Sequence, residues 1–90
     1  MISDTVQLRE RIIKNGYNDV VVLENPGYVD AFIGISIDNR AVYDFNKMVA
    51  CLIESDDMTE EEAVEFIEDK TIRSLPYYDD APIIVRPLDI

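Results

Sequence analysis

Apolar and polar residues follow a helical period at the start of the chain. The apolar positions of residues 4–15 recur broadly at the spacing of one helix face, and they are Val6, Leu8, Ile12 and Ile13. Ser3 or Asp4 can cap this segment, because either side-chain oxygen can accept from first-turn N–H groups. Gly16 can adopt the left-handed conformation that closes a helix. We therefore predict a helix from Asp4 to Asn15.

Short apolar runs rich in β-branched residues predict four strands. The runs are 19–23, 29–37, 41–43 and 82–85. Turns at 25–27 (Asn-Pro-Gly) and 38–40 separate the first three, since proline presets φ and glycine tolerates positive φ. In the second run, strict alternation places Phe32, Gly34 and Ser36 on one face and Ile33, Ile35 and Ile37 on the other. Strands joined by tight turns favour an antiparallel meander.

Two amphipathic helices are predicted before the last strand. The first runs from Phe45 to about Ser55 behind an Asp44 cap, and its apolar stripe is Phe45, Met48, Val49, Leu52 and Ile53. The second begins at Thr59, which forms a capping box with Glu62, and runs to about Lys70. Its buried stripe is Ala63, Val64, Phe66 and Ile67. We predict one α+β domain, 1–90: a small, mainly antiparallel sheet of about four strands, covered on one face by helices.

The charge balance narrows the classes of partner. The chain has 19 Asp and Glu against 8 Lys and Arg, a net charge of −11 at pH 7. This disfavours direct binding to nucleic acid or to an anionic membrane surface, because both attract basic patches. A basic protein partner, reached by electrostatic steering, is compatible with it. The alternative is that the charge only keeps a small protein soluble.

The usual catalytic groups are missing from the sequence. There is no histidine, the three glycines are scattered, and the single cysteine, Cys51, lies mid-helix without an activating base. Pairs of carboxylates arise by chance among so many acids, so they do not indicate acid–base catalysis. We therefore expect no enzymatic activity and no cofactor. The sequence has a single cysteine and shows no secretion signal. It also has no apolar run of the ~20 residues that span a bilayer. We therefore expect a cytoplasmic location.

The densest acidic segment lies between residues 54 and 69. It holds nine carboxylates and no basic residue: Glu54, Asp56, Asp57, Glu60, Glu61, Glu62, Glu65, Glu68 and Asp69. With helical spacing, Glu61, Glu65 and Glu68 form one outward stripe, although like charges at i, i+4 cost a few tenths of a kcal/mol. A solvated helix face, with its first-turn acids stabilised by the helix dipole, explains the same residues without a partner.

Two further features are candidates for function. The tetrapeptide Tyr77-Tyr78-Asp79-Asp80 places aromatic residues beside charges, as the centres of protein interfaces do. The loop from Asp56 to Glu60 offers hard oxygen ligands for calcium. It lacks the central glycine and the alternating oxygens of an EF-hand, so we predict no metal site and keep a divalent-ion regulator as an alternative.

The second half of the chain resembles a known group of proteins. The motifs are Ala41-Val42-Tyr43-Asp44, Lys47-Met48-Val49, 58–63 (MTEEEA), Phe66-Ile67 and 71–77 (TIRSLPY). They resemble small, largely uncharacterised proteins encoded by phages and prophages of Gram-positive bacteria. The shared positions are caps, turns and core, so the resemblance implies a phage setting and the cytoplasm of a bacterial host. By analogy with other small acidic phage proteins, it favours an inhibitor of host defence, such as an anti-CRISPR protein.

These observations combine into one leading hypothesis. The chain binds and regulates a basic protein, such as a host defence nuclease, with its carboxylates taking the place of nucleic-acid phosphates. The predicted contact residues are Glu54, Asp56, Asp57, Glu60, Glu61, Glu65, Glu68, Asp69, Tyr77, Tyr78, Asp79 and Asp80. The main alternative is a self-assembling structural component of a phage, in which residues 82–85 pair across a two-fold axis; the oligomeric state is left open.

Overall fold

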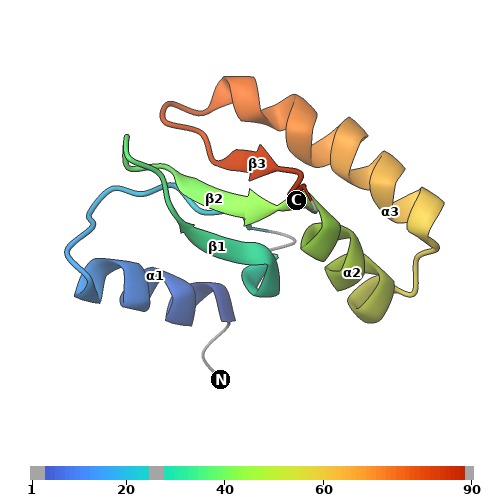
Figure 1. The fold of residues 1–90 in the computed structure, drawn as a ribbon, viewed down its shortest axis with the longest axis horizontal. Helices are drawn as coiled ribbons and strands as arrows, with labels where there is room; N and C mark the ends of the chain where they lie inside the picture. The colour runs from blue at the N-terminus through green and yellow to red at the C-terminus, as the bar shows by residue number, and fades with distance from the viewer. Residues whose placement is uncertain (1–3, 25–27, 89–90) are drawn as a thin grey trace.

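The computed structural model describes residues 4–24 and 28–88 and shows an α+β fold (Figure 1). The elements in chain order are α1 (Asp4–Lys14), a short 3₁₀ helix η1 (Val29–Ala31), β1 (Phe32–Ile35), β2 (Ala41–Asp44), α2 (Phe45–Asp56), α3 (Glu60–Phe66), a π-helix η2 (Ile67–Ile72), a 3₁₀ helix η3 (Leu75–Tyr77) and β3 (Ile83–Val85). The N-terminal helix and the two later helices are as predicted. The predicted turn at 25–27 and a cap at Ser3 lie outside the described residues.

The sheet of the described chain has three strands, where about four were predicted, and it is mixed. In the order β1-β2-β3, β1 pairs with β2 antiparallel, and β2 pairs with β3 parallel. The hairpin at 36–40 makes the first pairing, with Ser36 N donating to the Arg40 carbonyl at 2.8 Å. Between β2 and β3 the chain passes through α2, α3 and η2, the long crossover that parallel neighbours require. The antiparallel meander was therefore correct only for β1 and β2.

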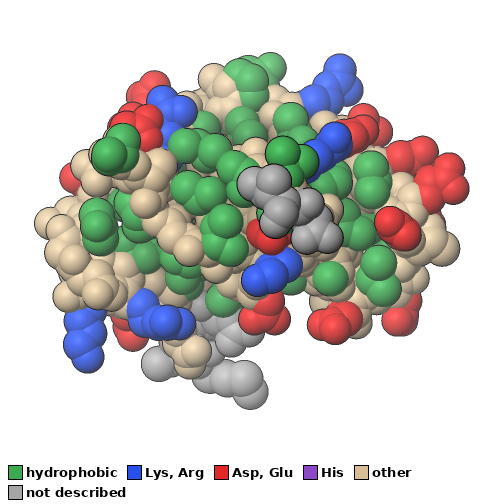
Figure 2. Space-filling view, viewed as in Figure 1, with side chains coloured by type: hydrophobic (Ala, Val, Ile, Leu, Met, Phe, Trp, Pro, Cys, Tyr) green, Lys and Arg blue, Asp and Glu red, His purple; other side chains and the backbone are tan. Residues whose placement is uncertain are grey.

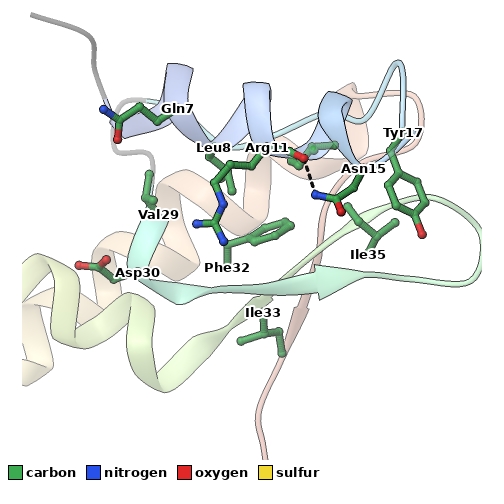
Figure 3. Close-up of a pocket in the computed structure, with 11 residues that line it drawn as sticks. Gln7, Leu8, Arg11, Asn15, Tyr17, Val29, Asp30, Phe32, Ile33 and Ile35 are labelled. Carbon is green, nitrogen blue, oxygen red and sulfur yellow. Dashed lines mark hydrogen bonds between the residues drawn. The ribbon is translucent and has the colours of Figure 1, made fainter.

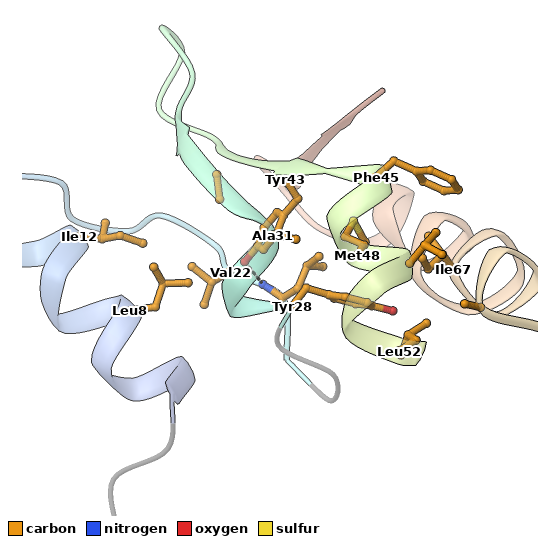
Figure 4. Close-up of a cluster of buried hydrophobic side chains, with 14 residues drawn as sticks. Leu8, Ile12, Val22, Tyr28, Ala31, Tyr43, Phe45, Met48, Leu52 and Ile67 are labelled. Carbon is orange, nitrogen blue, oxygen red and sulfur yellow. Dashed lines mark hydrogen bonds between the residues drawn. The ribbon is translucent and has the colours of Figure 1, made fainter. Parts of the chain in front are cut away.

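Residues 19–23, predicted as a strand, form no strand in the structure. Val22 and Leu23 are consecutive and both buried, whereas a strand with one face in water would bury only every second residue. Asp19 has a left-handed φ of 64°, which interrupts an extended run. The Leu23 N–H instead donates to the Tyr43 hydroxyl at 3.1 Å (Figure 4). This segment thus contributes apolar side chains to the core without joining the sheet.

A bulge in β1 overturns the alternation predicted for residues 29–37. The register shifts between Phe32, opposite Tyr43, and Gly34, opposite Val42. The extra residue brings both Phe32 and Ile35 against the core and leaves Ile33 51% exposed. Ile37 lies beyond the strand and is fully exposed. The first part of the run, 29–31, is the 3₁₀ helix η1 rather than strand.

One apolar cluster joins all the main elements (Figure 4). It takes Leu8 and Ile12 from α1, and its fully buried large side chains are Tyr43, Met48, Leu52 and Ile67. The last helix enters this cluster as a π-helix, where an α-helix ending at about Lys70 was predicted. There the Thr71 hydroxyl lies 3.0 Å from the hydroxyl of the buried Tyr28 and forms a hydrogen bond with it. Amphipathic spacing therefore predicted the buried helix faces, but not the widened turn.

Stability is expected to fall at alkaline pH because of two buried tyrosines. Burial raises the pKa of Tyr28 and of Tyr43 above the ordinary value of 10.0. Each stabilisation is present below the unfolded pKa and is lost as the pH rises through the folded pKa. The free energy of unfolding, measured with urea between pH 8 and pH 12, should therefore begin to fall near pH 10. The Tyr43→Phe variant should show a shallower loss, whereas Tyr77→Phe, at a side chain that is 89% exposed, should match the wild type.

A loss of equal depth in Tyr43→Phe and the wild type would contradict this account. Burial also raises the pKa of the Cys51 thiol. Because Cys51 is present in both proteins, the difference between the variant and the wild type reports on Tyr43.

Candidate functional site

All twelve predicted contact residues are exposed. Figure 2 shows Asp and Glu side chains gathered over the end of the molecule where α2 ends and α3 begins. We call the residues at this junction the acidic end: Glu54, Asp56, Asp57, Glu60, Glu61 and Glu65. The ion pairs of the described chain involve Glu24, Asp38 and Glu68, so none of them neutralises the acidic end.

The acids that begin α3 stabilise the helix itself. Thr59 and Glu62 form the predicted capping box: Glu62 N donates to Thr59 Oγ1 at 3.1 Å, and Thr59 N donates to Glu62 Oε1 at 3.0 Å. The hydrogen bond from the Thr59 backbone lowers the pKa of Glu62. Glu60 and Glu61 lie in the same first turn, where the positive end of the helix dipole favours carboxylates. Folding therefore accounts for these three charges.

The acids that end α2 have the opposite relation to their helix. Glu54 and Asp56 lie in its last turn and Asp57 is its C-cap, with no basic residue in that turn. The negative end of the helix dipole disfavours carboxylates there by about 0.3–1 kcal/mol each. Asp57 also has a left-handed φ of 52°, a conformation that glycine adopts more easily. Local folding thus explains the acids of α3 but not those of α2, a distinction the sequence could have revealed from the predicted helix end.

The outward stripe predicted on the third helix is shorter than its spacing indicated. Glu61 and Glu65 lie in α3. Glu68 and Asp69 lie in the π-helix η2, whose wider turn departs from α-helical spacing. Glu68 Oε1 also lies 3.5 Å from Arg86 Nη2, after β3, in an exposed ion pair. The free part of the predicted stripe is therefore Glu61 and Glu65.

The tetrapeptide 77–80 does not join the acidic end. Tyr77 is 89% exposed and Tyr78 51% exposed, at the end of η3. Figure 1 shows this segment at the opposite end of the long helix formed by α3 and η2. At 1.5 Å per residue, that helix separates the two places by roughly 20 Å. The structure thus supports two separate surfaces where the sequence suggested one.

Two further sequence candidates are the calcium-type loop at 56–60 and the Cys51 thiol. Over the described ranges, no group of three or more His, Cys, Asp or Glu side chains could hold a metal ion. Cys51 is half-buried, and burial raises the pKa of its thiol, which lowers the fraction of reactive thiolate at neutral pH.

No helix in residues 4–24 or 28–88 is long and apolar enough to cross a membrane.

Removing the capping box is expected to destabilise the protein without touching its core. Thr59→Ala deletes the acceptor for Glu62 N and should lower the free energy of unfolding by about 1 kcal/mol. The Thr59 backbone, and after it the Thr59 side chain, lowers the Glu62 pKa in the folded state, so Glu62 stabilises above its unfolded pKa and less as the pH falls. Thr59→Ala keeps the backbone contribution and loses the side-chain one. The difference between variant and wild type in urea unfolding should therefore narrow below about pH 4. A difference that widens on acidification would contradict the capping account, and Ser55→Ala at the exposed end of α2 is the control.

Comparison with protein-family models, curated proteins and solved structures finds no match to this chain.

Proposed function

We propose that this chain binds and regulates a basic protein through its acidic end. The partner class is a nucleic-acid-binding host protein such as a defence nuclease, and the setting is the cytoplasm of a bacterium carrying the phage or prophage. The carboxylates of the acidic end take the place of phosphates in the partner's basic groove. The resemblance of the second half of the chain to phage and prophage proteins supports this setting.

The observation that carries the proposal is the position of Glu54, Asp56 and Asp57. These carboxylates lie at the end of α2 that disfavours negative charge, and they are exposed and without an ion pair in the described chain. Charges that oppose folding are typical of surfaces maintained for binding, because function is a common reason to sacrifice stability. Their continuation into Glu60, Glu61 and Glu65 extends one sign of charge across the α2–α3 junction.

The charge distribution also favours one kind of partner. The net charge of −11 repels nucleic acid and anionic membranes and attracts a basic groove over distances of about a Debye length, ~10 Å at 0.1 M salt. Basic grooves are the sites where proteins hold nucleic-acid backbones. Occupation of such a groove blocks the substrate directly, so binding and inhibition follow from one contact.

Affinity capture with charge variants tests the proposal. Tagged wild-type protein, the Glu54→Lys/Asp56→Lys variant and a Glu10→Lys/Glu24→Lys control are incubated with lysate of a Gram-positive host at 50 mM and 500 mM salt. We expect the wild type and the control to retain a basic, nucleic-acid-binding protein at low salt only. The purified partner should then lose nucleic-acid binding or cleavage when the wild type is added. Equal capture by all three proteins would refute the proposal.

One observation keeps a self-assembling component as a second candidate. Within the segment 82–85, predicted to pair between copies, Ile83–Val85 form β3, an edge strand of the sheet. Edge strands present backbone groups that another strand can pair with. Light scattering across concentrations decides this alternative: a monodisperse monomer at millimolar concentration would remove it.

A further inference from the structure

A groove of about 640 Å³ separates α1 from β1 at the end of the molecule away from the acidic end (Figure 3). Leu8 and Ile12 line it from α1, and Phe32, Ile33 and Ile35 line it from β1. The apolar Ile33, 51% exposed at the bulge, is one of the more exposed large side chains in the fold. Polar side chains, among them Gln7 and Asn15, share the lining, so the groove is a concave surface of mixed polar and apolar character.

One wall of the groove is the open edge of the sheet. β1 is the first strand in the order β1-β2-β3, so one of its sides has no strand partner in the described chain. Ile35 lies opposite Ala41, one residue from the hydrogen-bonded pair of Ser36 and Arg40, and such pairs alternate along an antiparallel ladder. In an antiparallel pair the residue between two hydrogen-bonded pairs directs its N–H and C=O away from the partner strand. The backbone of Ile35 is therefore turned outward, where another extended strand can pair with both groups.

The groove also holds a cation with no carboxylate partner. Figure 3 shows Arg11 extending from α1 across the groove towards Phe32. No ion pair of the described chain includes Arg11, although its neighbour Arg9 lies 2.9 Å from Glu24. Asp30, the other charge in the lining, lies at the η1 end of the groove. The Arg11 guanidinium beside Phe32 can therefore form a charge-assisted pair with a carboxylate of a bound segment.

We propose that the groove binds an extended segment of a partner protein, added as a strand to β1, with an acidic side chain of that segment paired to Arg11. The open backbone at Ile35 can pair with an extended polypeptide, the apolar side chains of the lining can accept alternate side chains, and Arg11 supplies charge complementarity. β1 has four residues, so the added segment pairs over about 13 Å. This surface is separate from the acidic end, and the inference does not depend on the function proposed there.

A second copy of the chain fits the groove less well than a free segment. Figure 1 shows α1 running beside β1, so the β1 strand of another copy brings its own α1 to the shared edge, which a free segment does not. The bulge in β1 limits pairing to a short stretch, which also discourages edge-to-edge association of whole sheets. These features select for a short segment without a flanking helix.

Selection from a peptide library gives the probe for a direct test. A display library of random ten-residue peptides is selected on the immobilised full-length protein, and the best peptide is synthesised with a fluorescent label. We expect enriched sequences with alternating apolar residues and one Asp or Glu at a fixed position. Titration of this peptide into ¹⁵N-labelled protein should shift the amides of residues 33–35 and slow hydrogen exchange at Ile35. Failure to enrich any sequence, or shifts confined to the acidic end, would overturn the proposal.

Charge reversal with a matched control tests the role of Arg11. Arg11→Glu should weaken binding of the labelled peptide at least about tenfold, because a charge-assisted hydrogen bond is replaced by repulsion. Lys14→Glu changes the net charge equally in the same last turn of α1, but Lys14 does not line the groove, so binding should change less than about twofold. Equal effects of the two variants would remove Arg11 from the site. Protection of Ile35 that grows with protein concentration without peptide would assign the groove to a second copy and refute a partner segment.

Discussion

Replacing Glu54 and Asp56 by lysine is expected to stabilise the protein and weaken partner binding at the same time. Both carboxylates lie in the last turn of α2, where lysine interacts favourably with the helix dipole, so the two changes together should add about 1 kcal/mol to the free energy of unfolding. The same changes place two positive charges against a basic partner and should weaken binding about 100-fold at low salt. Thermal unfolding and calorimetric titration of the captured partner measure the two effects.

The opposite signs of these effects separate a binding role from a folding role. A variant that misfolds loses stability and binding together, whereas this variant should gain one and lose the other. In the Glu10→Lys/Glu24→Lys control, two charge reversals add four charges, so the net charge changes from −11 to −7 as it does in the test variant. The control should bind within about threefold of the wild type if location, rather than net charge, decides affinity. Loss of binding in both variants would assign the effect to net charge alone.

Salt should reduce the difference between the wild type and the test variant. Exposed charges are screened over about 10 Å at 0.1 M salt, so the advantage of the acidic end should shrink between 50 mM and 500 mM. The Glu61→Lys/Glu65→Lys variant should also weaken binding, but it should lose stability instead of gaining it. Glu61 lies in the first turn of α3, where the positive end of the helix dipole favours a carboxylate over lysine.

Local chemistry made the helix ends predictable from sequence. The capping box at Thr59, the cap at Asp44 and the left-handed Gly16 each depend on residues within four positions, and all three occur in the structure. Asp44 Oδ1 accepts from Lys47 N at 3.1 Å, so the first turn of α2 is capped by the residue that ends β2. Such signals survive folding because tertiary contacts rarely offer the exposed N–H groups a better partner.

The sheet was less predictable because its pairings depend on distant residues. β3 lies beside β2 only because the helices between them return the chain parallel to its starting direction, and no local signal fixes that choice. The segment 19–23 has strand-like composition, yet the flanks of β2 are occupied by β1 and β3, and burial of both Val22 and Leu23 takes precedence. The groove beside β1 follows from these events, so Arg11 could not be identified as a site residue from its helix alone.

For the site, exposure was predictable and arrangement was not. Polar positions opposite each apolar stripe place the acids of 54–69 outward, and the structure agrees. The distance between the acidic end and Tyr77 depends on the length of the continuous helix from α3 through η2, including a π-turn that sequence periodicity does not reveal. The ion pair of Glu68 with Arg86 likewise depends on where β3 ends.

Truncation of Leu52 is expected to be among the most destabilising single changes in this fold. Leu52 is fully buried on α2, in the cluster that joins α2 to α3, η1 and β2. Leu52→Ala should lower the free energy of unfolding by about 2–5 kcal/mol, because apolar contacts are lost and a cavity remains. A protein of this size has only about 5–15 kcal/mol of stability in total, so a large share is lost. Urea unfolding followed by circular dichroism measures the change.

The neighbouring residue supplies a control that differs in burial alone. Ile53 is on the same helix, one position later, and is 39% exposed, so Ile53→Ala removes a similar aliphatic group from a site where water already reaches. Ile53→Ala should lower the free energy of unfolding by at most about 1 kcal/mol. Part of the Ile53 side chain already lies in water and has no apolar contact to lose, and alanine has a higher helix propensity than isoleucine. Equal losses at the two positions would mean that α2 presents a different face to the core. The same rotation of α2 orients Glu54 and Asp56, so the residues of the acidic end would then have to be assigned again.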